Sequence, residues 1–245
     1  MADNRHVSPL AAAGGYDIPR IIIYGSGGYS LMVAHDLRHG RRSRPLCEVV
    51  AYIDDFAGGK GLDHDGAPII LFDEWREKFL DLPVFVGVAG PKAKRLLAER
   101  VTAAGGRFAR LFDSPDVAFP FVSMGDGAGV SGYSGIGSHT SLGAHVQIMP
   151  MCWIGHHVTI KDYVTVTPSC TILGNVIIEE EVFIGAGAVI VDGKPERPLV
   201  VGAGAKIAAG AVVTKSLAPG ATVAGNPARP LRDIARSRIV PRGAK

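Results

Sequence analysis

Two adjacent histidines, His156 and His157, are the side chains of this sequence best suited to move a proton near neutral pH. Gly174 follows them in the chain, and a glycine leaves its backbone N–H open to a developing negative charge. A base and an N–H donor together would serve transfer of an acyl group. The alternative is that both histidines are solvated residues of a surface turn, so the elements that carry them must decide.

A glycine-rich turn offers a second place for chemistry. Gly25-Ser26-Gly27-Gly28-Tyr29-Ser30 follows one short apolar run, and the acidic pair Asp54 and Asp55 ends the next. A dinucleotide-binding fingerprint would have a third glycine where Ser30 stands. The surrounding segment of about 100 residues also lacks a second mononucleotide-binding half, which argues against a dehydrogenase.

The remaining histidines and the cysteines give weaker signals. A metal site would need three converging ligands, and the spacing of His139 and His145 from the histidine pair does not provide them. Cys47, Cys152 and Cys170 form neither a disulfide framework nor a CxxC pair, which favours a reducing cytoplasm. Cys152 and Cys170 are predicted to be buried spacers, with a redox couple as the alternative.

Composition limits the function classes. The chain has 245 residues and a formal charge of +3, which excludes a nucleic-acid binder that works by bulk charge. There is no apolar run long enough to cross a bilayer, so neither a membrane span nor a secretory signal is expected. Glycine (32) and proline (16) are abundant although 47% of the chain is hydrophobic, which indicates a repetitive fold rich in turns.

The first half of the chain has the pattern of a small α/β domain, which we expect at residues 20–118. A flexible leader, residues 1–19, is expected to precede it. Short apolar strands alternate with helices, a pattern typical of a parallel sheet. The expected strands are 21–24, 49–53, 68–72, 84–88 and 108–112, and the expected helices are 31–39 and 92–103.

The second half carries a repeat of six residues. Eleven aliphatic residues recur at this period, and the position four residues after each is compact as well. Such a chain runs extended, bends and repeats, so it forms a β-helix whose coils, each made of three hexads, stack on one another. The aliphatic positions are Val130, Ile136, Leu142, Ile148, Ile154, Ile160, Val166, Ile172, Ile178, Ile184 and Ile190.

This repeat places the candidate residues in space. His156 and His157 fall at a corner of the coil, and Gly174 lies three hexads later, which is one coil further along the same edge. His139 lies one coil below His157, either as part of a polar stack or as another solvated corner. The series breaks once, where five extra residues between Val191 and Pro198 predict an excursion from the edge that carries His156.

From Ile21 to Leu231 the chain resembles the hexapeptide-repeat acyltransferases, in particular the group of sialic acid O-acetyltransferases and bacillosamine or perosamine N-acetyltransferases. The resemblance rests on the hexad array, on the α/β segment before it and on the ending Val223-Ala224-Gly225-Asn226-Pro227-Ala228-Arg229. It implies a Rossmann-like domain (residues 20–118) that binds a nucleotide sugar. It also implies a left-handed parallel β-helix (residues 119–228), followed here by a basic tail (residues 229–245).

The resemblance also implies residue roles. His156 would be the general base, Gly174 would present its amide to the thioester or oxyanion, and His157 stands where the family commonly has an acidic residue. Coenzyme A would contact Gly174, Ala186, Ala203, Asn226, Pro227 and Arg229. The nucleotide part of the sugar substrate would contact Gly25, Ser26, Gly27, Asp54 and Asp55.

The expected function is therefore that of a cytoplasmic, homotrimeric N-acetyltransferase that uses acetyl-CoA and no metal. Its acceptor would be a nucleotide-linked amino-deoxysugar for surface glycan synthesis. Two alternatives stay open at this stage: O-acetylation of a sialic-acid-like sugar on the same scaffold, and a non-catalytic trimer that only binds nucleotide sugars.

Overall fold

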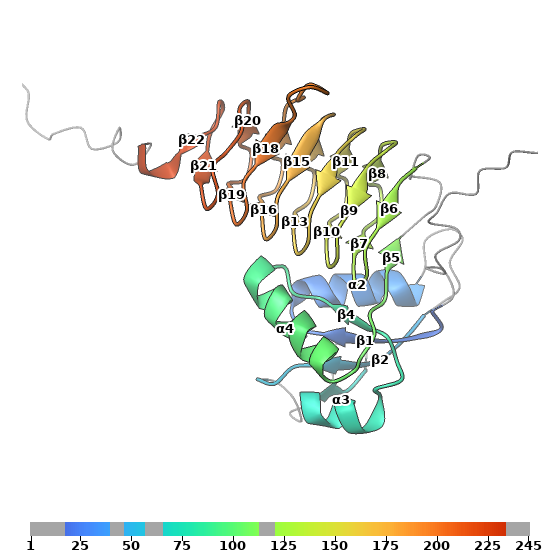
Figure 1. The fold of residues 1–245 in the computed structure, drawn as a ribbon. Coiled ribbons are helices and arrows are strands. Elements are labelled where there is room, and N and C mark those ends of the chain that lie inside the picture. Colours follow the sequence, from blue (N-terminus) through green and yellow to red (C-terminus); the bar gives the residue numbers. More distant parts are fainter. Residues whose placement is uncertain (1–17, 40–46, 57–65, 113–120, 234–245) are drawn as a thin grey trace, which may run out of the picture.

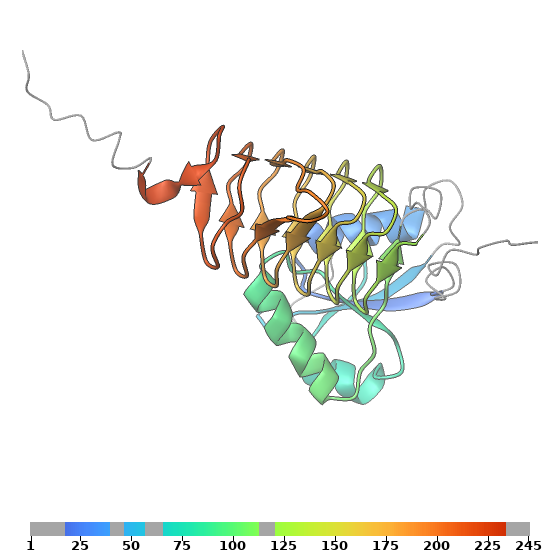
Figure 2. The same cartoon turned by 45° about the horizontal axis from the view of Figure 1, so that its top comes forward.

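The computed structural model describes residues 18–39, 47–56, 66–112 and 121–233 (Figure 1). The predicted leader lies outside these ranges except for its last two residues, and so does the tail from residue 234 onward. A small α/β unit is followed by a long stack of β-coils, and the unit packs against the side of the stack at its first coils (Figures 1 and 2). Within the described ranges, no helix is long and apolar enough to span a membrane.

The α/β unit is built on a parallel four-stranded sheet in the order β3-β2-β1-β4. Along β1 the side chains alternate between two clusters: Ile21 and Ile23 pack on one face, and Ile22 and Tyr24 on the other. Both faces are covered, one by α2 and the other by α3 and α4. The strands are Arg20–Tyr24 (β1), Glu48–Ile53 (β2), Ile69–Ile70 (β3) and Val84–Val86 (β4), and the helices are Gly28–His39 (α2), Phe72–Lys78 (α3) and Pro91–Ala103 (α4).

The β-coils form three parallel sheets that enclose one apolar column. The first sheet contains β5 (Leu111–Phe112), β7 (Gly129–Val130), β10 (Gln147–Ile148), β13 (Thr165–Val166), β16 (Phe183–Ile184), β19 (Lys206–Ile207), β21 (Thr222–Ala224) and the antiparallel β22 (Arg229–Pro230). The second contains β8 (Gly135–Ile136), β11 (Trp153–Ile154), β14 (Thr171–Ile172), β17 (Val189–Ile190) and β20 (Val212–Val213). The third contains β6 (Ser123–Met124), β9 (Ser141–Leu142), β12 (Thr159–Ile160), β15 (Val176–Ile178) and β18 (Leu199–Val201).

The predicted hexad period is confirmed. All eleven aliphatic positions are buried, and strand partners such as Gln147 and Thr165 are separated by three hexads. Cys152 and Cys170 are buried and free, as expected of spacers. At the corners, the residue three positions after all but the last of these aliphatics turns the chain in the left-handed region, as His157 does with φ of 54°. This conformation is uncommon for a residue other than glycine, and here the stacked hydrogen-bonded coils enforce it.

The predicted excursion is confirmed, and a second register change follows it. Val176 of β15 pairs with Leu199 of β18, so the coil between them is five residues longer than three hexads. Lys206 of β19 then pairs with Thr222 of β21, because the last coil is two residues shorter than three hexads. The hexad series gave no sign of this second change.

The predicted strand 108–112 is wrong as a single element. Phe108 bridges to Val84 in the α/β sheet, whereas Leu111 and Phe112 pair with β7. Phe112 pairs with Val130 and stands three hexads before it, so it continues the hexad column rather than the first sheet. The first β-coil therefore begins before residue 118, the expected end of the α/β domain.

Buried polar contacts fix the α/β unit to the coils. Lys94 of α4 is fully buried, and its Nζ donates to Thr165 Oγ1 at 2.8 Å and to the Val164 carbonyl at 3.1 Å. Burial holds the pKa of Lys94 well below its usual value. Gln147 Nε2 donates to the Val86 carbonyl at 2.6 Å. Because an unpaired buried polar group is costly, these contacts hold one relative placement of the two parts.

Candidate active site

His156 lies at the corner after β11, and its ring rests against Gly174 of the next coil. A Cβ added to Gly174 would lie 2.7 Å from His156 Cε1 and 2.8 Å from His156 Nε2. Position 174 must therefore be glycine if the imidazole is to lie there. The backbone reinforces the contact, since Asn175 N–H donates to the His156 carbonyl at 3.1 Å. The spacing of one full coil thus brings together the two residues expected to act together.

The Gly174 amide, however, already has an acceptor. Its N–H donates to Asp192 Oδ1 at 2.8 Å, one coil further along the same edge. Ala144 N–H donates to Asp162 Oδ1 of the following coil in the same way, also at 2.8 Å. The expectation of an open donor is therefore not met: an acyl oxygen would have to displace the Asp192 carboxylate.

His157 faces its neighbour. His156 Nδ1 lies 3.0 Å from His157 Nδ1, and the two rings meet edge to face. His139 stacks beneath His157 with ring centroids 4.9 Å apart, and Phe121 stacks beneath His139 at 4.7 Å. Of the two possibilities for His139, the structure shows the stack.

The excursion forms a cavity close to this edge. Its volume is about 370 Å³, and its walls are residues 192–194, 197–199 and 214–216. Lys194, Arg197 and Lys215 line it, and within the described ranges none of these three has a carboxylate at ion-pair distance. A second cavity of about 650 Å³ shares Lys215 and Ser216 with the first and continues along the end of the column. Lys215 lies outside the excursion, and no feature of the sequence pointed to it.

The other expected coenzyme A contacts do not gather at His156. Gly174, Ala186 and Ala203 follow strands of three different sheets, so they lie on three different edges of one chain. The chain returns to the same edge only after three hexads, which make one whole coil, and these three residues are not separated by whole coils. Asn226, Pro227 and Arg229 are exposed near the C-terminal end of the column, and the Asn226-Pro227 peptide is cis.

The glycine turn and the first acidic residue do meet. Ser26 Oγ donates to Asp54 Oδ2 at 2.6 Å, and Phe56 N–H donates to Asp54 Oδ1 at 3.0 Å. Gly25 has a φ of +104°, and a side chain there would strike Val88. Gly27 has open space around its Cα, so a ligand can approach this backbone closely.

Asp55, the second acidic residue, has several partners within the α/β unit. Arg100 and Tyr24 both donate to Asp55 Oδ2, and the Phe72 N–H at the start of α3 donates to Oδ1. Burial and the nearby Asp55 raise the pKa of Tyr24 to about 12. Arg100 is far from Asp55 in the sequence, and its helical position gave no sign of this pairing.

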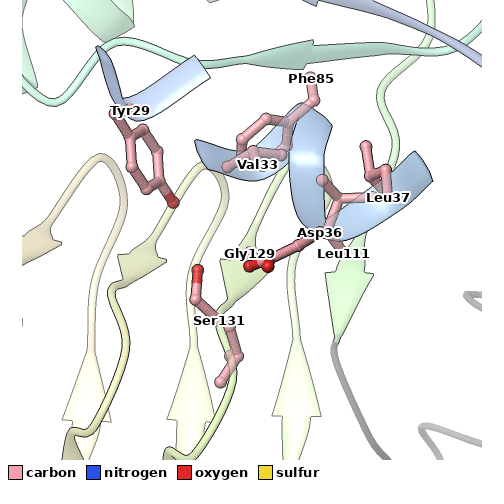
Figure 3. Close-up of a pocket in the computed structure, with 9 residues that line it drawn as sticks. Tyr29, Val33, Asp36, Leu37, Phe85, Leu111, Gly129 and Ser131 are labelled. Carbon is pink, nitrogen blue, oxygen red and sulfur yellow. The ribbon is translucent and has the colours of Figure 1, made fainter. Parts of the chain in front are cut away.

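A third cavity lies between α2 and the first coils (Figure 3). Tyr29 and Ser131 point into it from opposite sides, and its volume of about 20 Å³ has room for roughly one water. Neither His156 nor the Ser26 turn contributes to its walls, which come from the junction between the α/β unit and the first coils.

Comparisons with known proteins agree with this architecture. Residues 175–215 match the model of the hexapeptide repeat of succinyl-transferase. GDP-perosamine N-acetyltransferase from Escherichia coli O157:H7 is 31% identical over 224 residues, covering 86% of this chain and 95% of that protein. The structure of WeeI from Acinetobacter baumannii AYE is 30% identical with a TM-score of 0.73, covering 86% of this chain and 99% of that one. The acetyltransferase domain of PglB from Neisseria gonorrhoeae FA1090, solved with acetyl coenzyme A, is 25% identical with a TM-score of 0.75, covering 87% and 99%.

Proposed function

Because this chain belongs to the family of hexapeptide-repeat acetyltransferases that includes GDP-perosamine N-acetyltransferase, we propose that it uses acetyl-CoA to acetylate the amino group of a nucleotide-linked amino-deoxysugar. The observation that carries the proposal is the His156 ring lying against Gly174 on the edge where the cation-lined excursion begins. We place the enzyme in the cytoplasm, in surface glycan synthesis.

His156 is the general base of the proposed reaction. It accepts a proton from the sugar amine as the nitrogen attacks the acetyl carbonyl carbon. The new C–N bond forms, the C–S bond breaks, and coenzyme A leaves as the thiolate. An exposed imidazole at a corner can reach both substrates, and general-base catalysis of this kind contributes about 10²- to 10⁴-fold.

The acceptor could in principle carry a hydroxyl instead of an amine. O-acetylation would use the same base and the same amide. The N-acetyltransferase among the relatives favours the amine. Thiol release from acetyl-CoA, followed as nucleotide-linked amino sugars and their hydroxyl counterparts are added one at a time, tests the choice. Release with the hydroxyl compounds alone would contradict it.

Asp192 should compete with acetyl-CoA for the Gly174 amide. We expect Asp192→Ala to lower the KM for acetyl-CoA by up to about tenfold, because a hydrogen bond to a charged group is worth roughly 1.5–3 kcal/mol and solvent screens part of this one. Steady-state kinetics at fixed acceptor concentration measure the change. The matched control is Asp162→Ala, which removes the equivalent bond to Ala144 and should leave this KM unchanged. A rise in KM for Asp192→Ala would mean that the carboxylate helps to build the site.

The excursion should bind the phosphates of coenzyme A through Lys194, Arg197 and Lys215. Deleting residues 194–198 should raise the KM for acetyl-CoA and spare the fold. The deletion should be tolerated because the two ends of the excursion already lie side by side. Gly193 N–H donates to the Gly174 carbonyl, and Leu199 N–H donates to the Asn175 carbonyl.

The double variant Lys194→Ala with Arg197→Ala keeps the excursion and removes only its two positive charges. If charge matters, this variant reproduces most of the rise caused by the deletion. A rise in the KM for the sugar nucleotide would assign the excursion to the acceptor. Unchanged kinetics in both variants would show that the excursion contributes to the binding of neither substrate.

We assign the sugar nucleotide to the turn formed by Gly25, Ser26 and Gly27. Asp54 holds this turn in shape, and the open space at Gly27 admits a phosphate or a ribose. Asp55 is not part of this proposal, because Arg100, Tyr24 and the Phe72 amide already bond to it.

A homotrimer is the assembly that we propose. Tyr133, Met151 and Trp153 are 79%, 64% and 47% exposed. Trp153 lies in β11 of the second sheet, and Tyr133 and Met151 lie at the corner that leads into the strands of that sheet. Exposed apolar groups gathered in this way indicate an interface, and a triangular column suits three-fold packing.

The assembly is tested by sedimentation. We expect the native protein to have about three times the 25.7 kDa mass of one chain, and Met151→Asp to shift it toward the single chain. Leu96→Asp is the matched control, because Leu96 is equally exposed (67%) but lies on α4. Native protein that is active at the mass of one chain would contradict the trimer.

A further inference from the structure

The imidazole of His156 has one hydrogen-bonding partner within the described ranges, and that partner is another imidazole. The two Nδ1 atoms lie 3.0 Å apart, which is a hydrogen-bonding distance, and in such a contact one ring must donate its proton while the other accepts. Nε2 of His156 lies on the ring edge next to Gly174.

The proposed function fixes which ring must donate. To accept a proton at Nε2, a neutral His156 has to carry its own proton on Nδ1 and donate it to His157. His157 then accepts at Nδ1, is neutral, and carries its proton on Nε2. If His157 donated instead, the proton of His156 would sit on Nε2 and the base would be blocked.

The ring of His157 is exposed, so packing must hold it in the accepting orientation. His139 provides that packing from the coil below, with centroids 4.9 Å apart and the planes inclined by 23°. Phe121 stacks on His139 in turn, with ring centroids 4.7 Å apart and the ring planes inclined by 11°. All three residues have a positive φ at the same corner of successive coils, which aligns their side chains into one column.

We propose, on the basis of the function above, that His157 and His139 are positioning residues: the stacked His139 orients a neutral His157, which accepts the Nδ1 proton of His156 and so keeps Nε2 free to act as the base. Within the described part of the chain, the titratable groups around this pair are His139 below and Asp192, bonded to the Gly174 amide, above. A neutral acceptor orients the base without stabilising its protonated form, as a carboxylate would.

Three replacements of His157 separate orientation from charge. His157→Phe can stack but cannot accept, and we expect kcat to fall by about tenfold or more with little change in either KM. His157→Gln keeps a neutral acceptor and should stay within a few-fold of native. His157→Glu should stay active, but its negative charge should raise the midpoint of the acid limb of kcat/KM by about one pH unit. A His157→Phe enzyme with native kcat, or a His157→Glu enzyme with an unshifted acid limb, would overturn the proposal.

Replacements of His139 test the stack. We expect His139→Ala to lower kcat several-fold without changing either KM, and His139→Phe to restore it because phenylalanine stacks equally well. Equal losses in both variants would show that His139 does not act by stacking.

A measurement that does not depend on turnover tests this proposal independently of the proposed acetyltransferase function. Nitrogen-15 NMR of the histidine rings should show the Nδ1–H tautomer for His156 in the native protein and its loss in His157→Phe. If that result is obtained but no nucleotide sugar is acetylated, the pair stands and the proposed function fails. An Nε2–H tautomer for His156 in the native protein would overturn the proposal whatever the activity.

Discussion

Replacing His156 with alanine should lower kcat by about 10²- to 10⁴-fold while the protein keeps its fold and assembly. The side chain is exposed at a corner, outside the buried apolar column, so we expect its loss to remove the base without disturbing the column. Thiol release from acetyl-CoA under saturating acceptor measures kcat, and circular dichroism with sedimentation checks the fold.

His35→Ala is the control for this substitution. His35 is an exposed histidine on α2, remote in sequence from the corner, and its loss should leave kcat unchanged. If a correctly folded His156→Ala enzyme turned over at close to the native rate, another group would have to be the base.

The second large effect concerns stability. Ile178→Ala should lower the free energy of unfolding by about 2–5 kcal/mol, because it opens a cavity in a column where this side chain is fully buried. Ile177→Ala is a matched control, since the same residue type on the same strand faces outward and is only half-buried. Urea unfolding at a fixed protein concentration gives both values. Equal losses would mean that the inner column is not the main source of stability.

The column of β-coils could be predicted from the sequence because the six-residue repeat determines it. A period of six with buried aliphatics allows little beyond a stacked coil, and a spacing of three hexads then places Gly174 beside His156. The same spacing could have shown that Phe112 belongs to the column, and that Ala186 and Ala203 lie on other edges than Gly174.

Other features depend on contacts that no local pattern reveals. Asp192 reaches the Gly174 amide because of the geometry of two corners, and Asp55 is engaged by Arg100 from a distant helix. The burial of Lys94 follows from how α4 packs on the coils, while its sequence context is that of an ordinary helical surface lysine. The shortened last coil has no marker in the hexad series.

In the proposed reaction, an acetyl group is transferred to a sugar amine with His156 as the base. The direct test is to incubate the native protein and His156→Ala with acetyl-CoA and a panel of nucleotide-linked amino sugars, then to identify products by mass spectrometry and the position of the acetyl group by NMR. We predict one acetyl group per product, bonded to nitrogen, and formed at a rate that the variant loses. Products acetylated on oxygen alone would rule out the proposed N-acetylation, and an equal rate in both proteins would rule out His156 as the base.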